Sequence, residues 1–259
     1  MAPIPQDEAS LTLYEYVALA LAGFAAGWIN VLAGGGSLIT VAAMTFIGLP
    51  GPVANGTNRI AVIVQSLSAV AAFFRQGFSD FRLSMSLAAV ASIGAVIGAR
   101  IGVELSGAWF ERTLALVMLG VLALMATEQK APATSAGESL APRNLILGHG
   151  LMALAGIWIG FIQIGAGFLV MPILYRVMAL DLVRVNMHKV FITFITSIMA
   201  LFIFAAHVEI AWNAGAALAL GTIAGGWMGA HATVRRGARL VRIVLFVMII
   251  AMAAKLLLF

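Results

Sequence analysis

The chain has 259 residues, of which 63% are hydrophobic and only 10% are charged, and its mean hydropathy is +1.07. Soluble domains carry roughly 25% charged residues, so this composition excludes a soluble globular protein and predicts an all-α polytopic membrane protein in a lipid bilayer. The formal net charge of +5 does not indicate nucleic acid, because the basic residues stand in short segments between apolar runs, where they orient a membrane chain.

Ten apolar segments are expected, five in each half of the chain. They cover 12–33, 38–49, 54–74, 83–103 and 109–127 in the first half, and 145–164, 168–179, 184–206, 211–232 and 240–259 in the second. The second segment of each half has about 12 residues, or roughly 18 Å of helix, which is too short for a hydrocarbon core of about 30 Å. Each is therefore expected to be a half-helix or one arm of a re-entrant hairpin.

The segments outside these runs are polar. Residues 1–11 form an N-terminal tail without Lys or Arg, unlike the basic start of a secretory signal, so we expect the first helix to be retained. Residues 128–144, EQKAPATSAGESLAPRN, are expected to link a first transmembrane repeat at 12–127 to a second at 145–259. The chain has no cysteine, which excludes disulfides, thiol catalysis and thiolate metal sites, and we expect neither a metal nor a cofactor.

The second half repeats the first at one constant offset, which aligns Gly34 with Gly165 and Gly36 with Gly167. The same offset pairs Asn55 with Asn186, Ser66 with Ser197, Phe73 with Phe204, Gly94 with Gly225 and Gly98 with Gly229. The spacing Gly-x-x-x-Gly in the last two pairs is interpreted as a helix-packing motif. A membrane protein built from two related halves is typical of secondary transporters, in which the substrate site lies between the halves.

The charges of equivalent loops predict that the two repeats have inverted topology. Arg75 and Arg82 bracket the loop 75–82, whereas the equivalent loop 206–210 has no Lys or Arg. Conversely, the loop 233–242 carries four arginines, and its partner near 104–112 carries two glutamates and one arginine. By the positive-inside rule the basic loops and the linker are expected in the cytoplasm and both termini outside. A parallel repeat of four spans in each half fits these charges less well.

The run Gly34-Gly35-Gly36-Ser37 interrupts an apolar stretch and is expected to break the helix there. Ser37 is placed to cap the half-helix that follows, and the free N–H groups at such a helix start suit an anion. The counterpart in the second half is Gly165-Ala166-Gly167. Close helix packing through small residues is the alternative, but duplication beside a segment too short to span the membrane favours a binding element.

A second duplicated motif begins a long apolar segment in each half. It reads Asn55-Gly56-Thr57-Asn58-Arg59 in the first half and Asn186-Met187-His188-Lys189 in the second. A cation facing hydrocarbon costs roughly 2.5–3.5 kcal/mol, so Arg59 and Lys189, with no acid beside them in sequence, are expected to bind a small anionic substrate. The alternative is that both side chains reach a nearby interface. Gln163 and Gln65 are candidates for further polar contacts, or else for structural hydrogen bonds.

The stretches GGGSLIT and GLPGPVANGTNRIAV resemble the signature of the sulfite exporter TauE/SafE family, also called the toluene-sulfonate uptake permeases. The family's A-x-G-T-[NS] motif is matched by Ala54, Gly56, Thr57 and Asn58, whereas the second half keeps only the glycine pair and has Met-His-Lys in place of the motif. The resemblance implies transport of small sulfur-containing anions, such as sulfite or organosulfonates, usually across a bacterial inner membrane.

The sequence gives little indication of how transport would be coupled to an energy source, because the acidic residues stand in loops or near segment ends rather than within the apolar segments. His188 titrates near physiological pH and is the candidate for coupling to protons; a structural histidine, or a carrier without proton coupling, is the alternative. An anion channel fits the same cations. A membrane-embedded hydrolase would have to pair Ser37 with His188 or His149 without a G-x-S-x-G elbow, so we expect a transporter rather than an enzyme. The sequence does not determine the oligomeric state.

Overall fold

The computed structural model describes residues 11–104 and 142–258. In chain order the helices are α1 (Leu13–Leu32), α2 (Ser37–Phe46), α3 (Gly51–Arg75), α4 (Phe81–Glu104), α6 (Leu145–Phe161), α7 (Ala166–Pro172), the π-helical turn η1 (Ile173–Val177), α8 (Leu182–His207) and α9 (Trp212–Leu258). All regular structure in these described ranges is helical, which confirms the predicted all-α class, and α1, α3, α4 and α8 are each long and apolar enough to span a membrane. The expected segment 109–127, the N-terminal tail and most of the linker lie outside the described residues.

Each half opens with a helical hairpin, in which the short segment folds back against the helix before it. In the first half the chain turns at Gly34, whose φ is +85°, and the backbone of Gly36 then lies against Ala26 of α1. In the second half it turns at Gly165, with φ +72°, and comes back until the carbonyl of Met178 accepts a 3.0 Å hydrogen bond from the backbone two residues before α6. Glycine adopts such left-handed angles without steric cost, which explains the glycine at both turns.

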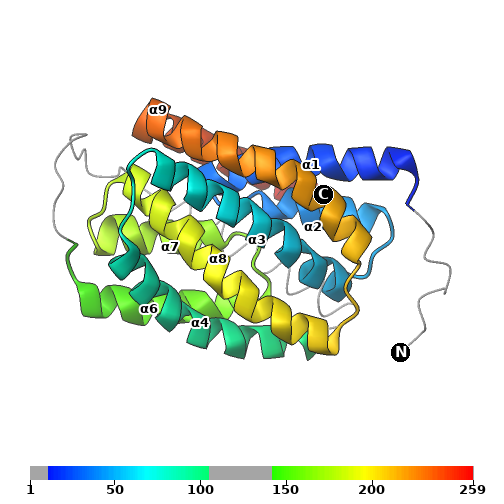
Figure 1. Ribbon diagram of the computed structural model, residues 1–259, viewed down its shortest axis with the longest axis horizontal. Helices are drawn as coiled ribbons and strands as arrows, with labels where there is room; N and C mark the ends of the chain where they lie inside the picture. Colours follow the sequence, from blue (N-terminus) through cyan, green and yellow to red (C-terminus); the bar gives the residue numbers. More distant parts are fainter. Residues whose placement is uncertain (1–10, 105–141, 259) are drawn as a thin grey trace.

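The helices form three layers in which the two halves are interleaved (Figure 1). α1 and α9 lie side by side in one outer layer, α4 and α6 form the other, and α3 and α8 lie between them. The first helix of each half therefore packs on a later helix of the other half. The two outer layers enclose a central region into which the tips of both hairpins project.

Glycines let the helices of each outer layer touch backbone to backbone. A Cβ added at Gly98 of α4 would lie 1.8 Å from the carbonyl oxygen of Ile157 on α6, and one added at Gly225 of α9 would lie 2.2 Å from that of Phe24 on α1. At seven further glycines in these two seams an added Cβ would lie 1.8–3.0 Å from the backbone of the facing helix: Gly23, Gly27, Gly94, Gly156, Gly160, Gly221 and Gly229. Small residues at membrane helix contacts permit such close approach, so the predicted packing role of both Gly-x-x-x-Gly motifs is confirmed.

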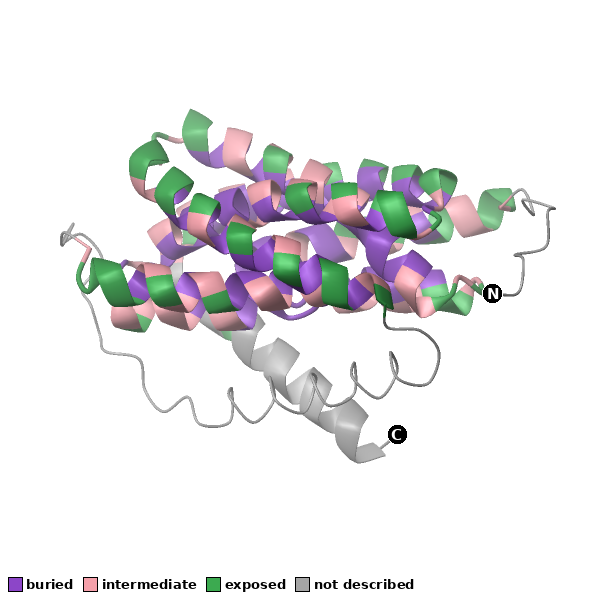
Figure 2. Ribbon diagram, turned by 90° about the horizontal axis from the view of Figure 1, so that it is seen from below, coloured by how far each residue is buried: buried purple, intermediate pink, exposed green. Residues whose placement is uncertain are grey.

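Large apolar side chains cover the outward faces of the helices, whereas the buried residues gather between the layers (Figure 2). The exposed apolar residues include Leu21, Ile93, Ile97, Leu154, Phe202 and Leu220. A surface of this kind would be unfavourable in water but matches lipid chains. The arrangement is that of a multi-pass membrane protein.

The loop expected at 233–242 is shorter than predicted: it is reduced to a break at Gly237, where the two helices that make up α9 meet. Only Gly237, with φ 60° and ψ −156°, departs from helical geometry inside this element. Arginine has a high helix propensity, so a run of arginines extends the helix past the apolar stretch, and the break is confined to one glycine. α3 likewise begins at Gly51, before the expected residue 54, because Pro52 is favoured in the first helical turn.

We predict that Gly98→Ala destabilises the protein and that Gly150→Ala does not. Both glycines are helical, but a Cβ at Gly150 meets no atom within 4 Å, so alanine there is expected to stabilise by roughly 0.5–1 kcal/mol. At Gly98 the added methyl must push α4 from α6, at a cost of roughly 1–3 kcal/mol. Thermal unfolding in detergent micelles compares the two, and equal melting temperatures would contradict the close seam.

Candidate functional site

The tips of the two hairpins meet at a backbone contact between Gly34 and Gly167. A Cβ added at Gly34 would lie 2.3 Å from Gly167 Cα, and one added at Gly167 would lie 2.4 Å from Gly34 Cα. The glycines come from different halves of the chain, so the contact joins the halves at their broken helices. Any side chain at either position would separate the tips.

A small cavity opens beside this contact. The residues that line it come from both halves: Asn30, Gly34, Ser37, Val62, Gln65, Ser66, Gln163, Ala166, Gly167, Lys189, Val190 and Thr193. Six residues that the sequence analysis singled out are thereby brought together, namely Gly34, Ser37, Gln65, Gln163, Gly167 and Lys189. A pocket at the interface of two repeats, formed by interrupted helices, is the usual location of a transporter's substrate site.

Lys189 places a buried cation in this cavity. Its side chain is 2% exposed, and Nζ donates to the carbonyl of Val31 at 2.6 Å and to Oδ1 of Asn186 at 2.7 Å. The third contact is Met171 Sδ at 3.8 Å, a weak acceptor. Val31 lies in the last turn of α1, where the helix dipole favours a cation. The ammonium therefore has two oxygen partners, and one of its three hydrogens lacks a strong acceptor.

Neutral polar side chains surround the ammonium. Asn30 Nδ2 donates to Gln65 Oε1 at 3.0 Å and to Ser37 Oγ at 3.3 Å, while Asn30 Oδ1 accepts from the backbone N–H of Gly36 at 3.1 Å. Asn30 thus fixes the first glycine break. On the other side Gln163 Nε2 donates to Ser197 Oγ at 2.6 Å.

Two buried polar atoms that face this region have no hydrogen-bond partner within the described part of the chain, Ser66 Oγ and Gln163 Oε1. Gln163 also has a φ of +60°, which is uncommon for a residue other than glycine and is often found at functional sites. An unsatisfied buried polar group costs roughly 1–3 kcal/mol. Two such groups in one cavity indicate a place for a polar ligand or for water.

Arg59 lies outside the cavity and holds the end of α6. Its guanidinium donates to the carbonyls of Ile159, at 3.1 Å, and of Gly160, and it stacks 4.5 Å from the ring centroid of Phe204. Asn55 Nδ2 donates to the next carbonyl, that of Phe161, at 3.0 Å. These are the last carbonyls of the helix, so α3 and the second hairpin are clamped together.

The other predicted site residues are buried, but they do not line the cavity. Thr57 Oγ1 accepts from the backbone N–H of Ala211, just before α9, and Asn58 Oδ1 accepts from Thr40 Oγ1 at 2.5 Å. His188 Nδ1 shares a 2.8 Å hydrogen bond with Ser84 Oγ of α4. Gly35, Gly36 and Gly165 form the turns, and Asn186 binds the ammonium from behind. Ser37 hydrogen-bonds with Asn30 rather than with a histidine, so the pairing that a hydrolase would need is not formed.

Three polar residues of the cavity were not predicted from the sequence: Asn30, Ser66 and Thr193. Two of them carry a signal that points to the site. Thr193 stands four residues after Lys189, and therefore on the same face of α8. Ser66 aligns with Ser197 in the repeat. Asn30 is a lone amide in an apolar run shortly before the glycines.

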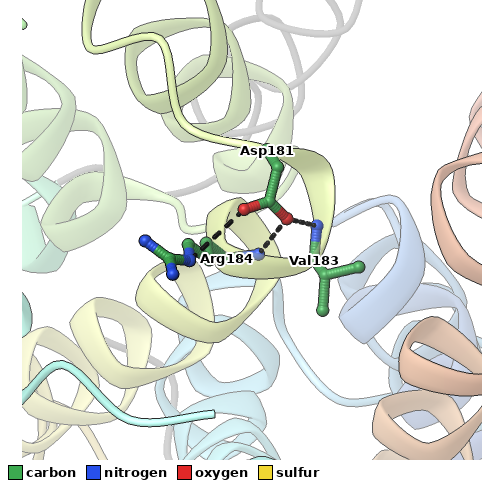
Figure 3. A network of polar contacts seen from close by, with 3 residues as sticks. All are labelled: Asp181, Val183 and Arg184. Carbon is green, nitrogen blue, oxygen red and sulfur yellow. Dashed lines mark hydrogen bonds and ion pairs between the residues drawn. The ribbon is translucent and has the colours of Figure 1, made fainter. Parts of the chain in front are cut away.

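Asp181 fixes where α8 begins, and so the register in which Lys189 reaches the cavity (Figure 3). Its Oδ1 accepts from the backbone N–H groups of Val183 at 3.0 Å and Arg184 at 3.1 Å, and Oδ2 lies 3.4 Å from Arg184 Nε. An aspartate at this position satisfies N–H groups that the helix leaves unpaired.

A sequence profile of the sulfite exporter TauE/SafE family matches residues 19–256. The chain belongs to this family. Curated relatives that match nearly end to end are "Probable membrane transporter protein ORF9" of Sinorhizobium sp, 25% identical over 92% of this chain and 91% of its own, and "Probable membrane transporter protein" of Haemophilus influenzae, 25% identical over 90% and 91%. A third is "Probable membrane transporter protein YfcA" of Escherichia coli K12, 24% identical over 90% and 86%.

No solved structure matches the chain significantly. Membership in the TauE/SafE family confirms the resemblance carried by the glycine run and the motif after it. Together with the apolar helices and the names of the relatives, it indicates a membrane transporter.

We predict that Arg59→Gln lowers the thermal stability of this TauE/SafE member. The variant leaves two helix-end carbonyls without their donor in a buried place, at a cost of roughly 1–3 kcal/mol each. The matched control is Arg100→Gln, since Arg100 is exposed on α4. Differential scanning fluorimetry in detergent should show a fall in melting temperature for Arg59→Gln alone. The clamp is refuted if the two variants melt together.

Proposed function

We propose that the protein is a secondary transporter of small sulfur-containing oxyanions, of the sulfite or organosulfonate type, with its substrate site in the cavity between the hairpin tips. The observation that carries the proposal is the buried Lys189 ammonium, which lines this cavity without an acidic residue among the described residues of the lining. The family description supports the chemical class of the substrate.

An anion in the cavity would complete the environment of the ammonium. A buried cation is costly unless it is paired, and Val31 and Asn186 supply only neutral oxygens. A tetrahedral oxyanion offers several acceptors at once, so it would receive a hydrogen bond from Lys189 and others from hydroxyls such as Ser66 Oγ. An uncharged substrate would leave the charge uncompensated.

Alternating access about this cavity is supported by a second cavity on one side of it. The second cavity is also small, and it is lined by Val70, Phe74, Phe78, Ser79, Asp80, Phe81, Ser84, Met187 and Phe191. It continues along α3 and α8 from the central cavity, since Val70 follows Ser66 by one helical turn. A packed apolar cluster that contains Met187 and Val190 separates the two cavities. We interpret the second cavity as a closed mouth of the transport pathway.

The orientation in a bacterial inner membrane is proposed from the charges at the two ends of the molecule. Arg75 lies 5.1 Å from the ring of Trp227, two turns before Arg235, so the basic ends of α3 and α9 share one side. Glu104 ends α4 near the end of α8, since Gly102 adjoins Phe204. Helices α3 and α8 thus begin at opposite ends, which supports inverted repeats with the basic end in the cytoplasm and both termini in the periplasm.

Lys189→Gln is predicted to abolish or strongly weaken anion binding. Loss of one charge-assisted hydrogen bond, worth roughly 1.5–3 kcal/mol, should lower the affinity for an organosulfonate about 10- to 100-fold. Calorimetry with the purified protein and uptake into proteoliposomes measure binding and flux, with Arg100→Gln as the control. Unchanged affinity in Lys189→Gln would remove the cavity from consideration as the anion site. Steady single-channel currents would instead favour a channel.

The proposed orientation has its own test. Because the chain has no cysteine, Ser79→Cys and Val208→Cys each introduce one reactive thiol in the loops after α3 and after α8. A membrane-impermeant maleimide should label position 208 in intact spheroplasts and position 79 only in inverted vesicles. Labelling of both positions from the same side would contradict the inverted arrangement.

A further inference from the structure

The central cavity carries a single formal charge among the described residues that line it. Lys189 supplies that charge, and the other lining residues are neutral. The second cation of the repeat, Arg59, is used on the α6 carbonyls outside the cavity. Asp80, the nearest acid of the second cavity, caps α4 through the N–H of Leu83 at 3.2 Å. The site therefore holds one uncompensated positive charge.

We propose that this cavity selects monovalent oxyanions over divalent oxyanions such as sulfate. The inference rests on the proposed function, because it specifies the substrate of the same site. One ammonium and one monoanion form a neutral pair in a buried cavity. A dianion would leave one negative charge unpaired there, and an unpaired buried charge is strongly unfavourable.

Neutral donors cannot easily make up the difference, because most of them are already used. The amide of Asn30 donates to Gln65 and Ser37, and the amide of Gln163 donates to Ser197. The hydroxyl of Thr193 donates to the carbonyl of Lys189 at 2.8 Å. Gln163 Oε1, which has no partner in the described structure, is an acceptor and would repel an additional negative charge.

The remaining wall of the cavity suits the organic part of a sulfonate. Val62, Ala166 and Val190 line it beside the polar residues. An alkyl substituent gains free energy when it leaves water for such a surface, whereas the fourth oxygen of sulfate loses hydration there without a donor. Charge and shape thus favour the same class of ligand.

Calorimetry with methanesulfonate and sulfate, two anions fully ionised at neutral pH, tests the proposal on the purified protein in detergent. We expect methanesulfonate to bind at least about tenfold more tightly than sulfate. Equal affinities, or tighter binding of sulfate, would overturn the selectivity and leave the anion site in place. If neither anion binds, the proposed function fails with it.

A second measurement compares the two anions in variants that carry an additional positive charge in the cavity. Gln163→Lys places a second cation in the cavity and is expected to shift the sulfate-to-methanesulfonate affinity ratio toward sulfate by about tenfold or more. Thr193→Lys, one helical turn from Lys189, makes the same test from α8 if the first variant does not fold. Gly150→Lys adds an equal charge on the exposed face of α6, away from both cavities, and should leave the ratio unchanged. A ratio that is the same in all folded variants would overturn the charge argument.

Discussion

The backbone contact between Gly34 and Gly167 determines most of what surrounds it. Irregular backbone is tolerated at membrane depth only where protein encloses it, because lipid offers no hydrogen bonds to unpaired N–H and C=O groups. Two broken helices must therefore meet inside the molecule, and they approach this closely only because neither residue has a side chain. The glycine seams of the outer layers then close the protein around them.

In both halves a cation on the third helix contacts backbone carbonyls of the other half, but the two cations have different roles. The third helix of each half sends a cation to the carbonyl end of the other half's first helix, Arg59 to α6 and Lys189 to α1. The planar guanidinium of Arg59 and the amide of Asn55 donate to consecutive carbonyls at the end of α6 and hold α3 against it. The compact ammonium binds one carbonyl and one amide and still faces a cavity. The same geometry thus stabilises the fold on one side and lines a cavity on the other.

Within the described residues, the sequence predicted most of the helices, both glycine breaks and several residues that line the cavity. It did not predict the directions in which the side chains point. Run lengths and glycines located the hairpins, since those features depend on local composition. Arg59 and Lys189 looked nearly equivalent because their repeat positions differ by one residue, and only the hydrogen bonds from Arg59 to the carbonyls of α6 distinguish them. Helices that are apolar on all sides give no periodic signal for an inward face, which is why Asn30 and Ser66 went unrecognised. The loop around the arginines near 235 was predicted too long, because charge usually marks a membrane edge, whereas the break between the two helices of α9 is confined to Gly237.

The interleaving of the halves affects how the chain is made. α1 packs along α9, yet roughly 180 residues separate the end of one from the start of the other. At usual rates of synthesis, about 5–20 residues per second, α1 waits roughly 10–40 s in the bilayer before its partner exists. Neither half can complete a core during that interval, so assembly follows insertion and has the high contact order of a slowly folding topology. Until then the glycine face of α1 is available to other small-residue faces in the membrane, and biogenesis of this transporter depends on that surface remaining unoccupied.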